Sequence, residues 1–183
     1  MSIHDPVSKI TYEEYCLFPN DGNRHEVING LHFINPAPNP RHQSISKHLQ
    51  HFLYTQIELE GLGKVFDAPI DVQFADHDIV QPDLLVILND GIAKITDTKI
   101  VGPPDLVIEI LSRSTAKNDF TIKRRLYEQS QVREYWIVDP DAQRIETYVL
   151  NDGKLAENGS ATEELKLAVL PEITIPVSKI FKS

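Results

Sequence analysis

Apolar residues recur with helical spacing between residues 42 and 57. Ile45, Leu49, Phe52, Leu53 and Ile57 follow one another at steps of four, three, one and four residues. This spacing places them on one face of a helix, and His42 falls in step with them at its start. The pattern predicts an amphipathic helix that closes near Gly61 and Gly63. Before it, residues 12–17 suit a short helix or turn.

Several segments have the patterns of strands. Asn29-Gly30 lies between two extended runs over residues 25–35, and Asp152-Gly153 interrupts a later stretch in the same way. Such turns between alternating apolar residues predict β-hairpins. Residues 64–74 alternate partly and contain Pro69, where a strand could bend. The runs at 79–88 and 105–111 are almost continuously apolar, which is typical of strands buried on both faces.

The order of these elements predicts the fold class. A helical segment at 118–129 lies between the apolar strands at 105–111 and 134–138. A strand, a helix and a second strand in this order indicate a β–α–β unit with parallel strands. We therefore expect an α/β (or α+β) fold with a central mixed β-sheet flanked by helices. The length of 183 residues suits a single domain over residues 1–183.

Two carboxylates interrupt the apolar strands. Asp83 follows Pro82 in IVQPDLLVIL, and Glu109 lies in DLVIEIL. A buried carboxylate is costly unless it is paired, protonated or bound to a metal ion. Each alone could lie at a strand end and meet water or an arginine. Together on neighbouring strands they would form an oxygen site suited to Mg²⁺ or Mn²⁺, and we expect both to share one ion. Because neutralising Asp83 removes a buried charge, Asp83→Asn is expected to leave folding intact.

The helix after Glu109 could add a cation to this site. Asp119, Lys123 and Tyr127 are spaced i, i+4 and i+8, so they share one face, and Ile122 and Leu126 define an apolar stripe beside it. A lysine near metal-binding carboxylates can orient water and neutralise charge that develops on a phosphate. The alternative is a helical Asp119–Lys123 ion pair without a catalytic role.

The charge distribution limits the kinds of partner. The net charge is −9 and the pI about 5.2, so nucleic-acid binding would depend on a local patch. Residues 113–133 contain six basic side chains and two acidic ones. The basic residues most suited to a nucleic-acid backbone are Arg113, Lys117, Arg124 and Arg125. A solvated helix face is the alternative.

Other classes of protein are disfavoured by composition. The single cysteine, Cys16, excludes an intrachain disulfide framework and a multi-cysteine zinc site. We find no apolar run long enough for a transmembrane helix and no signal-peptide pattern, so we expect a cytoplasmic protein without a membrane partner.

Several motifs together resemble a known family. They are QPD (residues 81–83), PPDLVIEILSRST (103–115), the D…K…Y set of the following helix, VREYWIVDP (132–140), TYEEYCLFP, RHEVINGLHF, PRHQ and PEITIPVSKIF. In this order they resemble the Uma-two (Uma2) family of restriction-type endonucleases in the PD-(D/E)XK nuclease superfamily. The resemblance covers nearly the whole chain and implies a restriction-endonuclease-like core.

The resemblance also implies roles for individual residues. Asp83 would be the aspartate of the PD signature, and Glu109 the acid of the second signature. The superfamily usually has lysine two positions after that acid, where this chain has Leu111, and Lys123 would supply the lysine from the next helix. Glu26 would be an additional acidic residue. The supporting residues would be Asp119 and Tyr127. His42 is a further supporting candidate from its own position at the start of the helix, where it is in step with the apolar face.

We therefore predict a Mg²⁺- or Mn²⁺-dependent endonuclease that hydrolyses DNA phosphodiester bonds. Its catalytic residues would be Asp83, Glu109 and Lys123, with the metal ion on Asp83 and Glu109. A homodimer is expected, since cutting both strands is easier with two sites. The alternative is a catalytically inactive nucleic-acid-binding or scaffolding protein that retains the nuclease fold.

Overall fold

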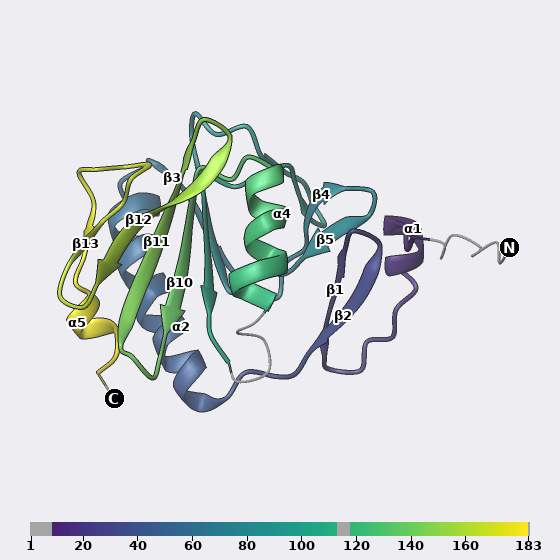
Figure 1. Ribbon diagram of the computed structural model, residues 1–183, viewed down its shortest axis with the longest axis horizontal. Helices are drawn as coiled ribbons and strands as arrows, with labels where there is room; N and C mark the ends of the chain where they lie inside the picture. Colours follow the sequence, from purple (N-terminus) through teal and green to yellow (C-terminus); the bar gives the residue numbers. More distant parts are fainter. Residues whose placement is uncertain (1–8, 113–117, 183) are drawn as a thin grey trace, which may run out of the picture.

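The computed structural model describes residues 9–112 and 118–182, which form two six-stranded β-sheets, one two-stranded sheet and a few helices. The two six-stranded sheets lie side by side, and one of them, called the second sheet below, lies next to α1 (Tyr12–Tyr15) (Figure 1). The architecture is mixed α and β, as the sequence predicts. No helix in these two ranges is long and apolar enough to cross a membrane.

The larger strands form what we call the core sheet. Its strands in spatial order are β12 (Lys154–Ala161), β11 (Arg144–Asn151), β10 (Glu134–Asp139), β9 (Leu106–Ile110), β6 (Leu84–Leu88) and β3 (Gly63–Asp67). β9 and β10 are parallel and the other neighbours antiparallel, so the sheet is mixed. The predicted β–α–β unit and the hairpin at Asp152-Gly153 are confirmed.

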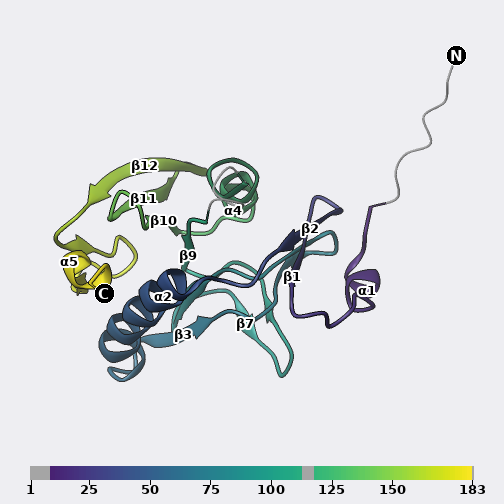
Figure 2. The same ribbon diagram turned by 90° about the horizontal axis from the view of Figure 1, so that it is seen from below.

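Helices cover both faces of the core sheet. One face packs on α2 (Pro40–Leu53) and its π-helical continuation η1 (Tyr54–Glu58). The other packs on η2 (Asp119–Lys123), also π-helical, and α4 (Arg124–Gln129). Figure 2 shows α2 and α4 on opposite sides of β9. Because side chains alternate along a strand, the even-numbered apolar residues of β9 face α2, and Val107 and Glu109 face α4.

The second sheet contains the predicted N-terminal hairpin at its edge. Its order is β2 (Leu31–Asn35), β1 (Arg24–Ile28), β5 (Asp78–Val80), β4 (Val72–Ala75), β8 (Ile100–Val101) and β7 (Lys94–Ile95). The turn at Asn29 and Gly30 has φ values of 53° and 78°, the left-handed region that favours these two residue types in tight hairpins. Tyr15 of α1 packs on Val27 and Ile79 of this sheet.

Two segments predicted as single strands each divide into two strands, and the two strands of each segment belong to different sheets. The run at 64–74 divides into β3 and β4, and the run at 79–88 divides into β5 and β6. Pro82 cannot donate a ladder hydrogen bond, and the preceding amide of Gln81 donates to the Glu26 side chain instead of to a strand. The chain therefore crosses between the sheets at residues 81–83, and Asp83 lies at a strand end rather than inside a strand.

The C-terminal part adds β13 (Leu165–Lys166), β14 (Thr174–Ile175) and α5 (Val177–Ile180) to the α2 side of the core sheet. Fully buried Glu134 joins this part to the sheet. Its Oε1 accepts a hydrogen bond from the Trp136 indole at 2.6 Å, and its Oε2 accepts from the amides of Ala168 and Val169 at 2.8 and 2.9 Å. Burial raises the pKa of Glu134 despite these hydrogen bonds.

We expect Glu134→Gln to lower the stability of the fold by about 1–3 kcal/mol, because the new amide group directs its own donors at buried N–H groups. Thermal denaturation followed by circular dichroism measures the change as a fall of roughly 5 °C in a protein of this size. The exposed Glu157→Gln on β12 is the control and should change the melting temperature by less than about 1 °C. An unchanged melting temperature in Glu134→Gln would contradict the assigned role.

Candidate active site

A cleft of about 790 Å³ opens where the second sheet meets the core sheet. The polar side chains at its base come from β1, the start of α2, the residue before β6, β9 and η2. They are Arg24, His42, Asp83, Glu109, Asp119 and Lys123. Residues 36–39 and 139–141 line its mouth, where Arg41 forms an ion pair with Asp141 at 2.8 Å.

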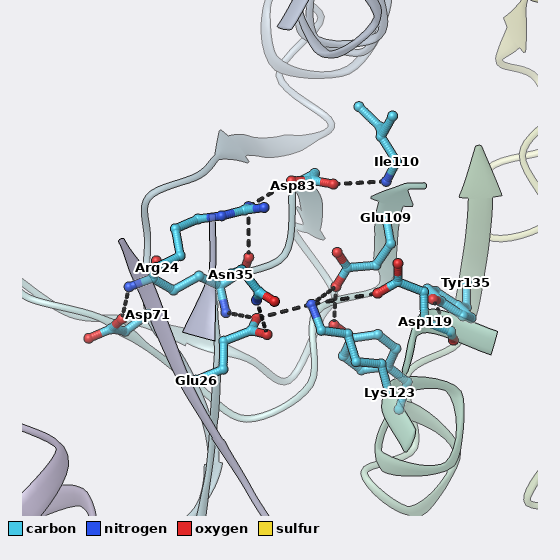
Figure 3. Close-up of polar contacts among 12 residues, drawn as sticks. Arg24, Glu26, Asn35, Asp71, Asp83, Glu109, Ile110, Asp119, Lys123 and Tyr135 are labelled. Carbon is cyan, nitrogen blue, oxygen red and sulfur yellow. Dashed lines mark hydrogen bonds and ion pairs between the residues drawn. The ribbon is translucent and has the colours of Figure 1, made fainter. Parts of the chain in front are cut away.

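Asp83 lies at the junction of the two sheets and is almost completely buried. Its Oδ1 accepts from Nη1 of Arg24 at 2.7 Å, and its Oδ2 accepts from the Ile110 amide at 2.8 Å (Figure 3). Oδ2 also lies 3.0 Å from Nε2 of His42. Burial by itself would raise the pKa of Asp83, but His42 and Arg24 outweigh it and lower the pKa to about 2. Asp83 is therefore an ionised carboxylate held by three donors.

Glu109 lies beside Asp83 and on the face of the core sheet that α4 covers. In the antiparallel pair of β6 and β9, Leu84 lies opposite Ile108. One residue further along this register, Asp83 lies opposite Glu109. Oε1 of Glu109 accepts from Nζ of Lys123 at 3.0 Å and from the hydroxyl of Tyr127 at 2.5 Å. Glu109 on β9 and Asp83, directly before the neighbouring strand β6, thus line the same cleft. The sequence predicts this proximity, although it places Asp83 inside a strand.

Lys123 lies at the centre of three carboxylates. Its Nζ is 3.0 Å from Glu109, 3.0 Å from Oε1 of Glu26 and 3.9 Å from Asp119 (Figure 3). Burial by itself would lower the pKa of Lys123, but these neighbours, Glu109 first, raise it above its ordinary value. Lys123 is therefore a permanent cation inside the protein and not a surface charge of the helix.

Glu26 reaches this cluster from the second sheet. Its Oε2 accepts from the Asn35 side chain at 2.6 Å, and its Oε1 accepts from the Gln81 amide at 2.8 Å. Gln81 is fixed in turn, since its side chain donates to Asp71 at 2.8 Å. The crossing between the two sheets therefore positions both Glu26 and Asp83.

Negative charge exceeds positive charge at the base of the cleft. Glu26, Asp83, Glu109 and Asp119 are each at most 4% exposed, and four carboxylates face two permanent cations, Arg24 and Lys123. Burial raises the pKa of Glu109 to about 8, and the neighbouring carboxylates add to this effect against the opposing influence of Lys123. The cluster thus retains a proton on Glu109 near neutral pH.

The raised pKa of Glu109 predicts how stability depends on pH. Between about pH 4.5 and pH 8 the folded protein holds a proton on Glu109 that the unfolded chain releases, so the free energy of unfolding falls as pH rises through this window. Asp83 acts in the opposite sense and only below about pH 4.

We expect Glu109→Gln to remove most of this fall, which should be on the order of 1 kcal/mol per pH unit. Urea denaturation at pH 5.5 and pH 8 in EDTA measures it, with Glu157→Gln as a control that keeps the wild-type slope. A slope that persists in Glu109→Gln would show that another group holds the proton.

The chemistry of these side chains fits a divalent cation, although the ligands are not arranged around an ion. Carboxylate oxygens are the preferred ligands of Mg²⁺ and Mn²⁺, and a divalent cation would offset the excess negative charge. Within residues 9–112 and 118–182, no three His, Cys, Asp or Glu side chains converge as a preformed set, because Arg24 and Lys123 already pair with the carboxylates. A cation would have to replace part of this pairing.

The predicted helix face is confirmed, with one correction. Lys123 and Tyr127 both contact Glu109, and Asp119 lies on the same side. Ile122, predicted to pack on the sheet, is 37% exposed, whereas Leu126 is buried. Residues 119–123 form a π-helix, whose i→i+5 hydrogen bonds make each turn longer than in the α-helix assumed from the sequence, so the α-helical spacing does not hold for Ile122.

Of the basic residues predicted to bind nucleic acid, the two that the structure describes, Arg124 and Arg125, do not line the cleft. Arg124 lies over the Tyr148 ring, with 4.2 Å to the centroid, and donates to the Leu155 carbonyl, so it packs on the β11–β12 hairpin. Arg125 is exposed on α4. Arg113 and Lys117 lie outside the described residues. The nucleic-acid contacts of all four residues stay predictions.

The sequence interpretation missed Arg24 and Asn35, which hold Asp83 and Glu26. A signal for Arg24 existed, because it precedes Glu26 by two positions and strand alternation places the two on one face. Asn35 had no comparable signal, since its role depends on the pairing of β1 with β2.

Comparison with known proteins identifies a matching family. The sequence profile of the family Uma2, described as "Putative restriction endonuclease", matches residues 11–178. No curated protein has a matching sequence.

Two solved structures are similar. A "putative nuclease belonging to DUF820" from Anabaena variabilis has a TM-score of 0.77 at 20% identity, over 94% of this chain and 97% of that chain. The type IIG restriction endonuclease BpuSI has a TM-score of 0.38 at 12% identity, over 62% of this chain and 12% of that chain. The first similarity shows the fold.

Proposed function

From the fact that the chain belongs to the Uma2 family of restriction-type endonucleases, we propose that it is a Mg²⁺- or Mn²⁺-dependent endonuclease that hydrolyses DNA phosphodiester bonds. The observation that most supports this is the buried cluster of Asp83, Glu109 and Lys123 at the base of a cleft, with Glu26 beside it. Clustered carboxylates with a cation are what metal-assisted phosphodiester hydrolysis requires.

The carboxylates would hold the cation. Asp83 and Glu109 are the first ligands, and Glu26 is the third acid within reach because it shares Lys123 with Glu109. A bound Mg²⁺ or Mn²⁺ supplies Lewis-acid polarisation of a phosphate oxygen and lowers the pKa of water. For Glu109 to serve as a ligand it must release the proton that burial favours, so cation binding is expected to release protons.

Lys123 and its neighbours would stabilise the reacting phosphate. The ammonium of Lys123 remains charged, because Glu26 and Asp119 face it even when Glu109 holds a proton, and it can neutralise negative charge that develops on the phosphate. Tyr127 fixes Glu109 through its 2.5 Å hydrogen bond, and burial keeps the Tyr127 hydroxyl protonated by raising its pKa well above the ordinary value. Asp119 lies 3.9 Å from Lys123 and helps hold it in the cleft.

A second candidate is a nucleic-acid-binding or scaffolding protein that retains the fold without cutting. The observation in its favour is that Arg24 and Lys123 pair with the carboxylates that a cation would use. The net charge of −9 and the acidic residues at the mouth of the cleft oppose binding of a polyanion, which favours the scaffolding form of this candidate over nucleic-acid binding.

Nicking of supercoiled plasmid DNA distinguishes the two candidates. We expect nicked and linear products with Mg²⁺ or Mn²⁺ and none with EDTA, and a Glu109→Gln preparation purified in parallel controls for contaminating nucleases. Equal cutting by the wild type and Glu109→Gln, or no cutting with either ion, would contradict the proposed activity and favour the binding protein.

A further inference from the structure

Arg24 occupies the part of Asp83 that a cation would need. Oδ2 of Asp83 has two partners, His42 and the Ile110 amide, which use the two lone pairs of a carboxylate oxygen. Oδ1 has Nη1 of Arg24 at 2.7 Å. A cation that binds Oδ1 would therefore meet the positive charge of Arg24 on the same oxygen, and the two must compete.

The Arg24 guanidinium has unused hydrogen-bonding capacity at the cleft. Its Nε is buried and has no hydrogen-bond partner, while Nη1 makes both contacts assigned to the group, to Asp83 and, at 3.4 Å, to the Gln81 carbonyl. A buried donor without an acceptor is unfavourable and calls for an explanation. The side chain is 17% exposed and lines the cleft, so a ligand can reach it.

A phosphodiester fits this guanidinium. The planar fork of arginine matches two oxygens of a phosphate in a bidentate contact, and a substrate phosphate must enter this same cleft if the proposed function is right. A partly buried Arg24 displaced from Asp83 needs another anion nearby, and a phosphodiester arriving with the cation supplies it.

We propose, resting on the function proposed above, that Arg24 binds the phosphodiester and blocks the cation site until the phosphodiester is present. In the cation-free protein Arg24 holds Asp83. When a phosphodiester enters, Arg24 transfers to a phosphate oxygen and leaves Oδ1 to the cation. Cation and phosphodiester therefore bind cooperatively, and by linkage each strengthens the other by the same factor.

Mn²⁺ binding without cleavage tests this inference. The amount of unbound Mn²⁺ is measured by electron paramagnetic resonance, with and without dimethyl phosphate as the phosphodiester probe. For the wild type we expect dimethyl phosphate to lower the Mn²⁺ dissociation constant by about tenfold, the size of one charged hydrogen bond. In Arg24→Gln we expect Mn²⁺ to bind about tenfold more tightly without the probe and to lose the response to it.

Matched variants separate competition from a general effect of charge. Arg41→Gln removes the same charge at the mouth of the cleft, where Arg41 pairs with Asp141 and not with Asp83, and it should behave as the wild type does. If Arg24→Gln does not fold, Arg24→Lys keeps the charge but lacks the Nε–H donor, and we expect weak Mn²⁺ binding and loss of most of the coupling.

The outcomes distinguish this inference from the proposed function. If Asp83→Asn binds Mn²⁺ as the wild type does, the cation site itself is misplaced and the proposed function fails. If Asp83→Asn loses Mn²⁺ while Arg24→Gln binds it no more tightly than the wild type, only the role of Arg24 is overturned. Wild-type coupling that persists in Arg24→Lys also overturns it.

Discussion

Asp83→Asn is expected to reduce plasmid nicking to the level seen in EDTA, a loss of about 10³-fold or more, since the cation loses an anionic ligand. The loss should lie in the turnover rate at saturating DNA. The measurement is the initial nicking rate in Mn²⁺ at equal concentrations of folded protein.

The structure also changes what this variant should do to stability. The sequence alone predicts that this nearly isosteric change leaves folding intact. Asp83, however, is the anion that compensates Arg24, and removing one partner of a largely buried ion pair is unfavourable. We now expect a cost of about 1–3 kcal/mol, less than for a fully buried pair because Arg24 is 17% exposed.

Glu134→Gln is the matched control for this experiment. It is also a buried carboxylate changed to an amide, with a similar expected cost in stability, but its partners Ala168 and Val169 lie away from the cleft. Glu134→Gln should cut at the wild-type rate per folded molecule. If both variants lose cutting in proportion to their loss of stability, Asp83 is a structural residue and its assignment as a metal ligand is wrong.

Sequence reasoning succeeded where the signal was local. The spacing of Asp119, Lys123 and Tyr127 required only that the segment be helical, and the position of Glu109 in an apolar strand required only that the strand be buried. The expectation that the two apolar runs lie next to each other is confirmed by the pairing of β6 with β9.

Sequence reasoning failed where the outcome depended on tertiary packing. The apolar pattern of IVQPDLLVIL hides the division between two sheets, because both halves are apolar and both are buried. Only Pro82 signals a break in the strand. The pairing of Arg24 with Asp83 depends on this division, since the crossing at residues 81–83 sets Asp83 beside Arg24 of β1. For the same reason Glu26 could be assigned only through the family resemblance.

Lys123 gives the second prediction of large effect. Lys123→Ala is expected to lower the nicking rate in Mn²⁺ by about 10²-fold or more, because the phosphate loses a charge partner at the transition state. Either substitution removes the ammonium that faces three buried acidic side chains, which is expected to lower stability. Lys123→Met, which keeps most of the side-chain volume, should therefore be measured beside Lys123→Ala. Both variants should lose activity, and Met should retain more stability.

A lysine at position 111 should restore part of this activity. Leu111 is two residues after Glu109, so the strand period places both side chains on one face, and both line the cleft. Leu111 is only partly buried, which leaves space for a longer side chain to extend toward Glu109. In Lys123→Met/Leu111→Lys the ammonium would return to the same carboxylate from the strand, the position that the superfamily usually uses.

Nicking rates of the wild type, Lys123→Met, Leu111→Lys and the double variant decide the question. Leu111→Lys alone controls for a general gain of positive charge, and it should not exceed the wild type, because Lys123 already neutralises the site. Wild-type cutting by Lys123→Met would show that the buried lysine only balances charge. If the single variant is inactive and the folded double variant is inactive as well, Lys123 keeps its role and the equivalence of the two positions is wrong.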